Sequence, residues 1–105
     1  MGKHTNPYTK DFLAKRRIVD GKVERILEGR DHPNLRPCPF CGSDSVIMEH
    51  TWTPSYWVEC EDCGARVSDN RSRTWDNPDL ISLAFHKRSM RYAAEAWNSR
   101  VPHAD

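Results

Sequence analysis

The sequence predicts a small α+β protein, in which a three-stranded antiparallel sheet is packed by a C-terminal helix and preceded by a partly helical N-terminal extension. Three observations lead to this fold class. Two Cys-x-x-Cys turns stand eighteen residues apart in the middle of the chain. The segment between the two turns is rich in β-branched and aromatic residues, and the last third carries apolar residues at helical spacing. Because only 37% of the 105 residues are hydrophobic, we expect a small core that needs further stabilisation, such as a bound metal ion or disulfides.

The chain divides into a basic N-terminal extension, residues 1–34, and a ribbon domain with its helix, residues 35–105. Apolar residues recur in the extension at roughly helical spacing: Phe12, Leu13, Val19, Val23, Ile26 and Leu27. Gly21 interrupts this pattern, so we expect two short helices here. Asp20-Gly21 could instead be the turn of a β-hairpin.

Three strands are expected in the middle of the chain. Residues 45–51 and 56–60 have the composition of strands, and the intervening Trp-Thr-Pro-Ser supplies a turn. A third, shorter strand is expected at residues 65–68. Together they predict an antiparallel sheet of three strands.

The last third of the chain predicts one long helix. Asn77 can cap it, and Pro78 suits the first helical position. Apolar residues then recur at three- and four-residue steps: Leu80, Leu83, Ala84, Met90, Ala94 and Trp97. Asn98 and Pro102 mark the end of the helix.

The four cysteines form the pattern C-x2-C, eighteen residues, C-x2-C: Cys38, Cys41, Cys60 and Cys63. Two such turns, facing each other across a hairpin, can place four thiolates at the corners of a tetrahedron. Each turn ends in glycine, which can adopt a positive φ and so direct backbone N–H groups at the sulfurs. The pattern therefore predicts one structural Zn²⁺ held by all four cysteines, with no vacant position for catalysis.

Three other uses of the cysteines agree less well with the pattern. A thioredoxin-like redox pair would be a single C-x2-C that starts a helix in a βαβ unit. A disulfide framework belongs in a secreted protein, and the first ten residues lack the apolar core of a signal peptide. A rubredoxin-type iron site remains chemically possible.

Other polar and aromatic residues do not suggest catalysis. Neither Ser, His and Asp nor paired carboxylates are arranged with a catalytic spacing, so we do not expect an enzyme, and His50 is expected in a surface or packing role. Trp52, Tyr56 and Trp57 could stack on single-stranded nucleic acid, but they more readily cover a small core. Alternation along the strand puts Trp57 opposite Tyr56, where it could pack on the C-terminal helix near Trp97.

Charge is distributed unevenly along the chain. Residues 1–37 carry nine Lys and Arg against five Asp and Glu, residues 38–70 one against six, and residues 71–105 six against four. Six basic side chains could contact phosphates: Arg66, Arg71, Arg73, Lys87, Arg88 and Arg91. The second cysteine turn, however, carries Glu59, Glu61 and Asp62, and a zinc ion with four thiolates adds a further negative charge. We therefore expect weak or no direct nucleic-acid binding, and a protein partner.

The sequence gives no sign of a membrane segment. A spanning helix needs about 20 consecutive apolar residues, and no stretch of the chain approaches this. We expect no membrane partner and a cytoplasmic location.

Three sequence blocks resemble the Lar family of restriction alleviation proteins. They are LRPCPFCGSDSV (35–46), YWVECEDCGA (56–65) and AAEAWNSR (93–100). The family pattern is a leading L-x-P-C-P-F-C-G turn, an aromatic strand into C-x-x-C-G-A, and a helix that ends in A-W-N-x-R. The resemblance covers residues 35–100, although about 28 residues separate the second turn from the helix end, more than in short versions of the family.

The resemblance implies a small zinc-ribbon protein carried by bacteriophages and prophages. It puts the four cysteines at the metal positions, and Ala96, Trp97 and Asn98 at a helix end that docks on the ribbon. It also implies that the protein blunts host type I restriction and favours modification, which makes a type I restriction–modification complex of the host cell the implied partner.

We therefore expect a non-enzymatic accessory protein that acts against host defence by binding a host protein. The alternative is a nucleic-acid-binding zinc ribbon associated with the transcription machinery. A basic arm that becomes ordered on DNA would favour the alternative. An acidic, exposed cysteine turn with an apolar rim would favour the protein partner.

Overall fold

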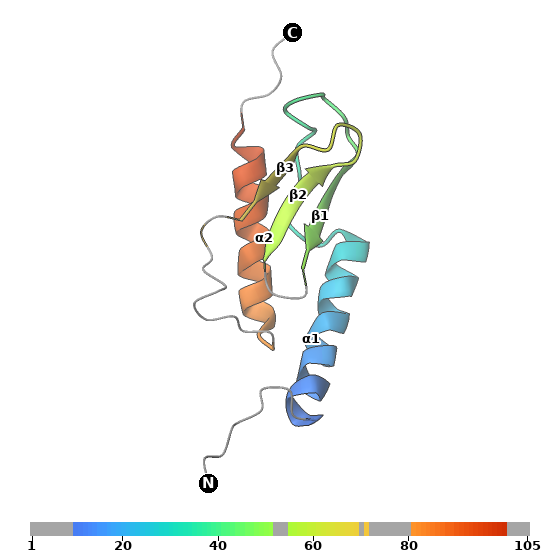
Figure 1. Cartoon of the computed structure of the whole chain (residues 1–105), viewed down its shortest axis with the longest axis vertical. Helices are drawn as coiled ribbons and strands as arrows, with labels where there is room; N and C mark the ends of the chain where they lie inside the picture. The colour runs from blue at the N-terminus through green and yellow to red at the C-terminus, as the bar shows by residue number, and fades with distance from the viewer. Residues whose placement is uncertain (1–9, 52–54, 70, 72–80, 101–105) are drawn as a thin grey trace.

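The computed structural model describes residues 10–51, 55–69, 71 and 81–100. Its elements are, in chain order, α1 (Lys10–Gly29), β1 (Val46–His50), β2 (Tyr56–Cys60), β3 (Arg66–Ser68) and α2 (Leu83–Asn98). Helix α2 lies along one face of the sheet, and α1 lies largely beyond one end of the sheet, on the side of the first half of α2 (Figure 1). The predicted fold class, an antiparallel sheet of three strands packed by the C-terminal helix, is confirmed. The boundary predicted at residue 34 remains a prediction.

The sheet has strand order β1-β2-β3, and its register sorts the side chains onto two faces. Val46 pairs with Cys60, Met48 with Val58, and Val58 in turn with Val67. These residues are buried because successive side chains alternate between faces, and this face points at α2. The apolar alternation that predicted the strands therefore corresponds to the covered side of the sheet.

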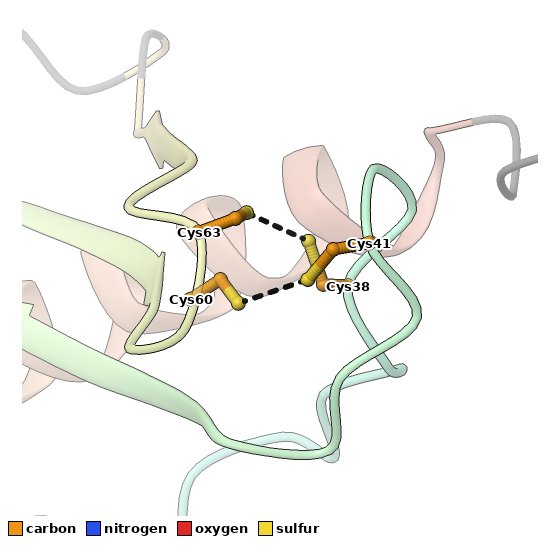
Figure 2. Close-up of side chains that lie close together, drawn as sticks. All are labelled: Cys38, Cys41, Cys60 and Cys63. Atoms are coloured by element: carbon orange, nitrogen blue, oxygen red, sulfur yellow. Dashed lines mark hydrogen bonds between the residues drawn. The ribbon is translucent and has the colours of Figure 1, made fainter.

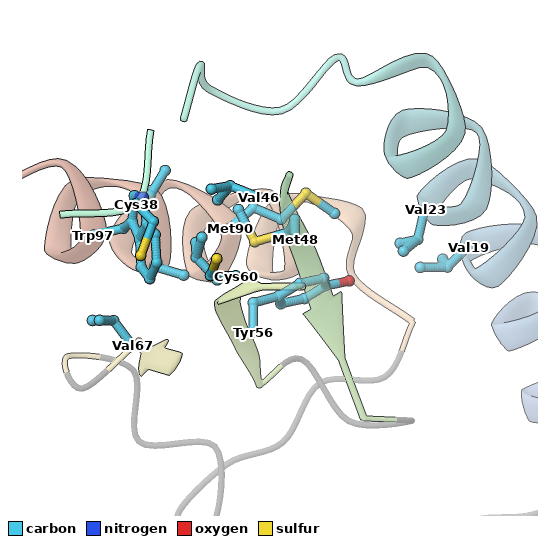
Figure 3. Close-up of a cluster of buried hydrophobic side chains, with 13 residues drawn as sticks. Val19, Val23, Cys38, Val46, Met48, Tyr56, Cys60, Val67, Met90 and Trp97 are labelled. Atoms are coloured by element: carbon cyan, nitrogen blue, oxygen red, sulfur yellow. The ribbon is translucent and has the colours of Figure 1, made fainter. Parts of the chain in front are cut away.

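Helix α2 supplies the other half of the core. Its buried apolar residues are Met90, Ala93, Ala94 and Trp97. The two alanines allow the helix backbone to lie close to the strands, while Trp97 and Met90 fill the space on either side of them. Figure 3 shows the cluster running from Trp97 and Cys38 at one end to Val19 and Val23 of α1 at the other.

A short chain of polar contacts crosses the core between β2 and α2. The Tyr56 hydroxyl lies 2.7 Å from Nδ1 of His86, and both side chains are buried. Burial raises the pKa of Tyr56, so its hydroxyl stays protonated and can donate to that nitrogen. Ser89 accepts the backbone N–H of Tyr56 and donates to the carboxylate of Asp69 at 2.7 Å. These contacts fix the position of α2 along the sheet, since each would be lost if the helix slid by one turn.

No described helix covers the opposite face of the sheet, which we call the open face, and Trp57 lies there. The prediction that Trp57 packs on the C-terminal helix near Trp97 is wrong, because α2 covers the Tyr56 face. The Arg66 guanidinium instead lies 4.8 Å from the centre of the Trp57 ring, and the indole N–H donates to Glu59 at 3.2 Å. Arg66 also bonds Glu59 at 2.8 Å, directly across the strands, and lowers the pKa of that carboxyl.

Helix α2 begins later than predicted. Ser82 is its N-cap and accepts the backbone N–H of Phe85 at 3.2 Å, so the first helical residue is Leu83. The predicted cap Asn77, together with Pro78, Leu80 and Pro102, lies outside the described residues. The helix ends at Asn98 as expected. Ser82 takes the capping role because its hydroxyl can reach the orphan N–H groups of the first turn.

Residues 10–29 of the extension form one continuous helix, so both predicted alternatives for this segment, two short helices and a hairpin, are wrong. Helix α1 runs through Gly21, and its residues Val19 and Val23 are buried in the same cluster as the ribbon core. Burial of this stripe outweighs the cost of about 1 kcal/mol for one glycine in a helix interior. The helix ends in a Schellman motif at Arg30, which has a φ of +55° and precedes the Asp31 N–H bond to the Ile26 carbonyl.

In the described part of the chain, no helix has the length and apolar character needed to cross a membrane.

Trp97 should be one of the largest single contributors to stability, because it is 1% exposed and joins helix, sheet and the segment before the first cysteine turn. We expect Trp97→Ala to lower the free energy of unfolding by about 3–5 kcal/mol, measured by urea denaturation at fixed zinc concentration. Trp97→Phe should lose only the indole hydrogen bond and part of the volume, and so cost less. An unchanged unfolding curve for Trp97→Ala would contradict the packing role.

Gly21→Ala should stabilise the protein. A Cβ atom at Gly21 would meet nothing within 4 Å, and alanine is favoured over glycine in a helix interior by about 1 kcal/mol. We expect a gain approaching that value in the free energy of unfolding, together with greater helical circular dichroism. If residues 10–29 formed two helices with a bend at Gly21, the substitution would be neutral or destabilising.

Candidate metal centre

The four predicted cysteines lie together at one end of the sheet. Their Sγ atoms all lie within 4.8 Å of one another, and the closest pairs, Cys38–Cys63 and Cys41–Cys60, are 3.6 Å apart. Figure 2 shows the four side chains pointing inward from two facing turns. Cys38 and Cys60 are buried against the core, whereas Cys41 and Cys63 are exposed at the tip.

The separation of the sulfurs fits a tetrahedral metal ion. Zinc–sulfur bonds of about 2.3 Å place the corners of a tetrahedron roughly 3.8 Å apart, close to the observed distances. A disulfide would require the sulfurs to be about 2.05 Å apart, so the cluster is not two disulfides. Four thiolates suit zinc better than hard cations, which prefer oxygen. The site can therefore hold a metal ion, for which zinc is the best chemical match.

The first turn, residues 38–43, closes around its own backbone. The N–H of Gly42 donates to the Cys38 carbonyl and the N–H of Cys38 to the Ser43 carbonyl, both at 2.8 Å. Gly42 has a φ of +79°, a conformation that a side chain would disfavour. This reversal leaves the N–H of Phe40 directed at the Cys38 sulfur, at 3.4 Å.

The second turn repeats the same geometry at the end of β2. Gly64 has a φ of +77° and donates to the Cys60 carbonyl at 2.9 Å, and the Cys60 N–H donates to the Ala65 carbonyl at 2.8 Å. Two turns of the same form thus present two sulfurs each, as the paired glycines in the sequence indicated.

The two turns are joined to each other independently of the sulfurs. The Glu61 N–H donates to the Ser45 carbonyl at 2.8 Å, and the Ser43 hydroxyl donates to the carboxylate of Asp62. The Ser45 N–H in turn donates to Ser43 Oγ at 3.0 Å. These bonds hold the turns at the separation that four converging sulfurs need.

Electrostatics make the cluster dependent on a cation. Backbone N–H groups, chiefly that of Cys63, lower the pKa of Cys60 to about 7. The Ser43 N–H also favours the thiolate of Cys41, but desolvation and hydrogen bonds to the other three thiols together raise the pKa of Cys41 to about 12. One thiolate therefore forms readily and opposes the ionisation of its neighbours. A divalent cation would remove this opposition and allow all four thiols to ionise.

The end of α2 is fastened to the segment that leads into the first turn. The Trp97 indole N–H donates to the Arg36 carbonyl at 2.9 Å, and the Asn98 side chain accepts the Arg36 N–H at 2.8 Å. The Asn98 amide also donates to the Asn34 carbonyl at 2.7 Å. The expectation that the A-W-N helix end docks on the ribbon is confirmed, and the bonds show how the helix positions Cys38.

The remaining candidate residues lie away from this centre. His50 stacks on Tyr56, with ring centres 4.9 Å apart, in the packing role expected of it. Lys87, Arg88 and Arg91 lie exposed on α2. Arg66 lies on the open face of the sheet; Trp52 and Arg73 are outside the described residues.

Phe40 is a surface feature that we did not single out from the sequence. It is 53% exposed at the tip of the first turn, between the two cysteines. Its position between the two cysteines does not by itself predict this exposure, because Pro39 lies between them as well and is buried. Glu61 and Asp62 occupy the equivalent position in the second turn and are also exposed. We call Phe40, Glu61 and Asp62 the knuckle surface.

Comparison with known families matches residues 33–101 to the family described as restriction alleviation protein Lar. The match spans about two thirds of the chain, includes both cysteine turns and the end of α2, and confirms the resemblance of the three sequence blocks. No curated protein and no solved structure matched the chain.

Assignment of Cys38, Cys41, Cys60 and Cys63 as ligands of one zinc ion remains a prediction with a direct test. Elemental analysis should find one zinc per chain, and any single Cys→Ser change should cause loss of metal and unfolding of the ribbon, because binding and folding are coupled. The matched control is Ser45→Ala, which removes an exposed hydroxyl beside the first turn, keeps the backbone bonds of that residue and should keep its zinc. Iron in the purified protein, or full zinc content after a cysteine is replaced, would contradict the assignment.

Proposed function

We propose that this chain, which belongs to the Lar family of restriction alleviation proteins, relieves host restriction as a phage-encoded binding protein and not as an enzyme. Its partner would be a host protein, namely a component of a type I restriction–modification complex, in the host cytoplasm. The family match over residues 33–101 is the observation that carries this proposal.

The candidate metal centre supports a binding role. If Zn²⁺ occupies the four-cysteine site, every coordination position is filled by protein, so the ion cannot activate water. Its contribution would be folding energy, on the order of 10 kcal/mol, in a ribbon too small to be stable by burial alone. The metal would thus hold the two turns and the knuckle surface in place.

The knuckle surface has the properties of a small protein-binding site. It combines an exposed aromatic ring with two exposed carboxylates, on the end of the molecule that the sulfurs and Asn98 make rigid. A buried aromatic anchor with charged residues around it is the usual arrangement of an interaction hot spot. Carboxylates would favour a basic patch, such as a DNA-handling enzyme presents, and would add to association rate and specificity.

Phe40→Ala tests this proposal. Because Phe40 is half exposed, its removal should change stability by less than about 0.5 kcal/mol. We expect it to weaken binding to a purified type I restriction–modification complex by about 2 kcal/mol, roughly 30-fold. The plating of unmodified phage on a restricting host that expresses the variant should fall towards the level without the protein. Ile18→Ala is the matched control, since Ile18 is 60% exposed on α1.

Two results would contradict the proposal. If the wild-type protein left phage plating on a restricting host unchanged, the proposed function itself would be contradicted. If a stably folded Phe40→Ala variant relieved restriction normally, the proposed function would stand, but the knuckle surface would not be the interface with the host protein.

The alternative, a nucleic-acid-binding ribbon, is favoured by arginine side chains that lie next to aromatic rings on α2. Arg88 lies 4.5 Å from the centre of the Phe85 ring, and Arg71 and Arg91 lie 4.8 and 5.2 Å from that of Tyr92. These rings are already covered by the chain's own guanidinium groups, which leaves less aromatic surface for base stacking. Arg71 and Arg91 are further paired with Glu95.

We therefore expect weak binding to DNA. Duplex and single-stranded DNA, titrated at about 150 mM salt, should bind no more tightly than the 10⁻⁴ to 10⁻⁶ M typical of non-specific contacts. Sub-micromolar binding with a steep dependence on salt would favour the alternative over a protein partner.

A further inference from the structure

A groove between the two helices takes no part in the proposed function. It has a volume of about 870 Å³ and lies between the end of α1, the segment that follows it, and the first half of α2. Its lining includes the apolar side chains of Ile26, Phe85 and Met90. The groove is therefore able to accept an apolar side chain from a partner.

The rim of this groove is basic. Lys87, Arg88 and Arg91 line it and are exposed, whereas Asp31 is the one carboxylate among the described lining residues. A partner that places a carboxylate beside these cations gains electrostatic attraction, and one that places a cation there is repelled. Apolar lining with a basic rim calls for an apolar residue flanked by acidic ones.

The knuckle surface of the same chain has this chemistry. Phe40 is an exposed apolar ring, and Glu61 and Asp62 are the exposed carboxylates of the adjacent turn. It cannot reach its own groove, because the knuckle adjoins the end of α2, where Asn98 binds Arg36, whereas the groove begins at Ser82 and Ala84. A helix of sixteen residues, about 24 Å long, separates those two ends.

We propose that the knuckle surface of one copy docks in the basic groove of a second copy, with the Phe40 ring among Ile26, Phe85 and Met90. The acidic residues of the knuckle complement the basic rim of the groove. A nucleic-acid base finds less to stack on, because the Arg88 guanidinium already lies 4.5 Å from the centre of the Phe85 ring. The contact is heterologous, so it joins copies head to tail and leaves a free knuckle at one end and a free groove at the other.

Self-association would regulate access to the knuckle surface. The docked Phe40 and its carboxylates are covered, so only the terminal copy presents them to another protein. The proposal concerns the purified protein alone, and its test therefore succeeds or fails independently of restriction alleviation.

The test is the molar mass of zinc-loaded, nuclease-treated full-length protein, measured by sedimentation equilibrium. Between about 1 µM and 1 mM protein, the mass should rise at least twofold from the 12.2 kDa of the chain. It should return towards the monomer value at about 0.5 M salt, because exposed charges are then screened.

Charge reversal identifies the two surfaces. Lys87→Glu/Arg88→Glu reverses the charge of the groove rim, and Glu61→Lys/Asp62→Lys reverses the charge of the knuckle surface. Each variant alone should self-associate about 100-fold more weakly than wild type. Mixing the two variants should restore association, since the acidic groove now faces a basic knuckle. Lys10→Glu/Arg17→Glu on α1 changes the net charge as the groove variant does and should associate like wild type. Zinc content and circular dichroism verify that each variant is folded.

Several outcomes would overturn the proposal. They are a wild-type protein that stays at 12.2 kDa near 1 mM, association that survives reversal of the groove, and reversed variants that fail to associate when mixed. Association that nuclease treatment abolishes would also overturn it, and would assign the groove to nucleic acid.

Discussion

Convergence of four sulfurs is the constraint on which the rest of this structure depends. Thiols within 4.8 Å of one another cannot all ionise without a cation, so the cluster strongly favours a bound metal ion. The same convergence fixes the covalent neighbours of the sulfurs. Cys60 ends β2 opposite Val46 of β1, so the position of the site and the register of the sheet are set together. A slip of one residue would both turn the apolar face outward and remove Cys60 from the cluster.

Helix α2 is the second element that stabilises the sheet. The sheet buries one face only, and its three short strands would be only marginally stable without a helix to cover that face. Trp97 and Asn98 bind the segment just before Cys38, while Ser89 and His86 bind Tyr56 at the far end of β2. The helix is thus attached at both ends of the sheet, and its apolar stripe lies over the core between them. Loss of the metal should therefore destabilise the packing of the whole helix on the sheet.

The distribution of charge gives the molecule two different ends. The knuckle surface is acidic, and a metal site of four thiolates would make its surroundings more so. The groove at the other end of α2 is rimmed by Lys87, Arg88 and Arg91. A net charge of +1 conceals this separation, because the two regions nearly cancel. Both the proposed host contact and the proposed self-association follow from the arrangement of charge and not from its total.

The sequence by itself determined the elements that depend on local chemistry. The spacing of the cysteines and their glycines predicted which side chains meet, because a tight turn with positive φ is a local property. Strand alternation followed from periodicity, and the helix end at Asn98 from residues that stop helices. Only the tertiary structure decided the rest. Residues 10–29 form one helix because Val19 and Val23 find a core that the sequence does not display. Trp57 lies on the open face because α2 covers the other one, a choice between two faces that alternation alone leaves undecided. The groove exists because the end of α1 and the start of α2, more than fifty residues apart in sequence, are brought together by packing.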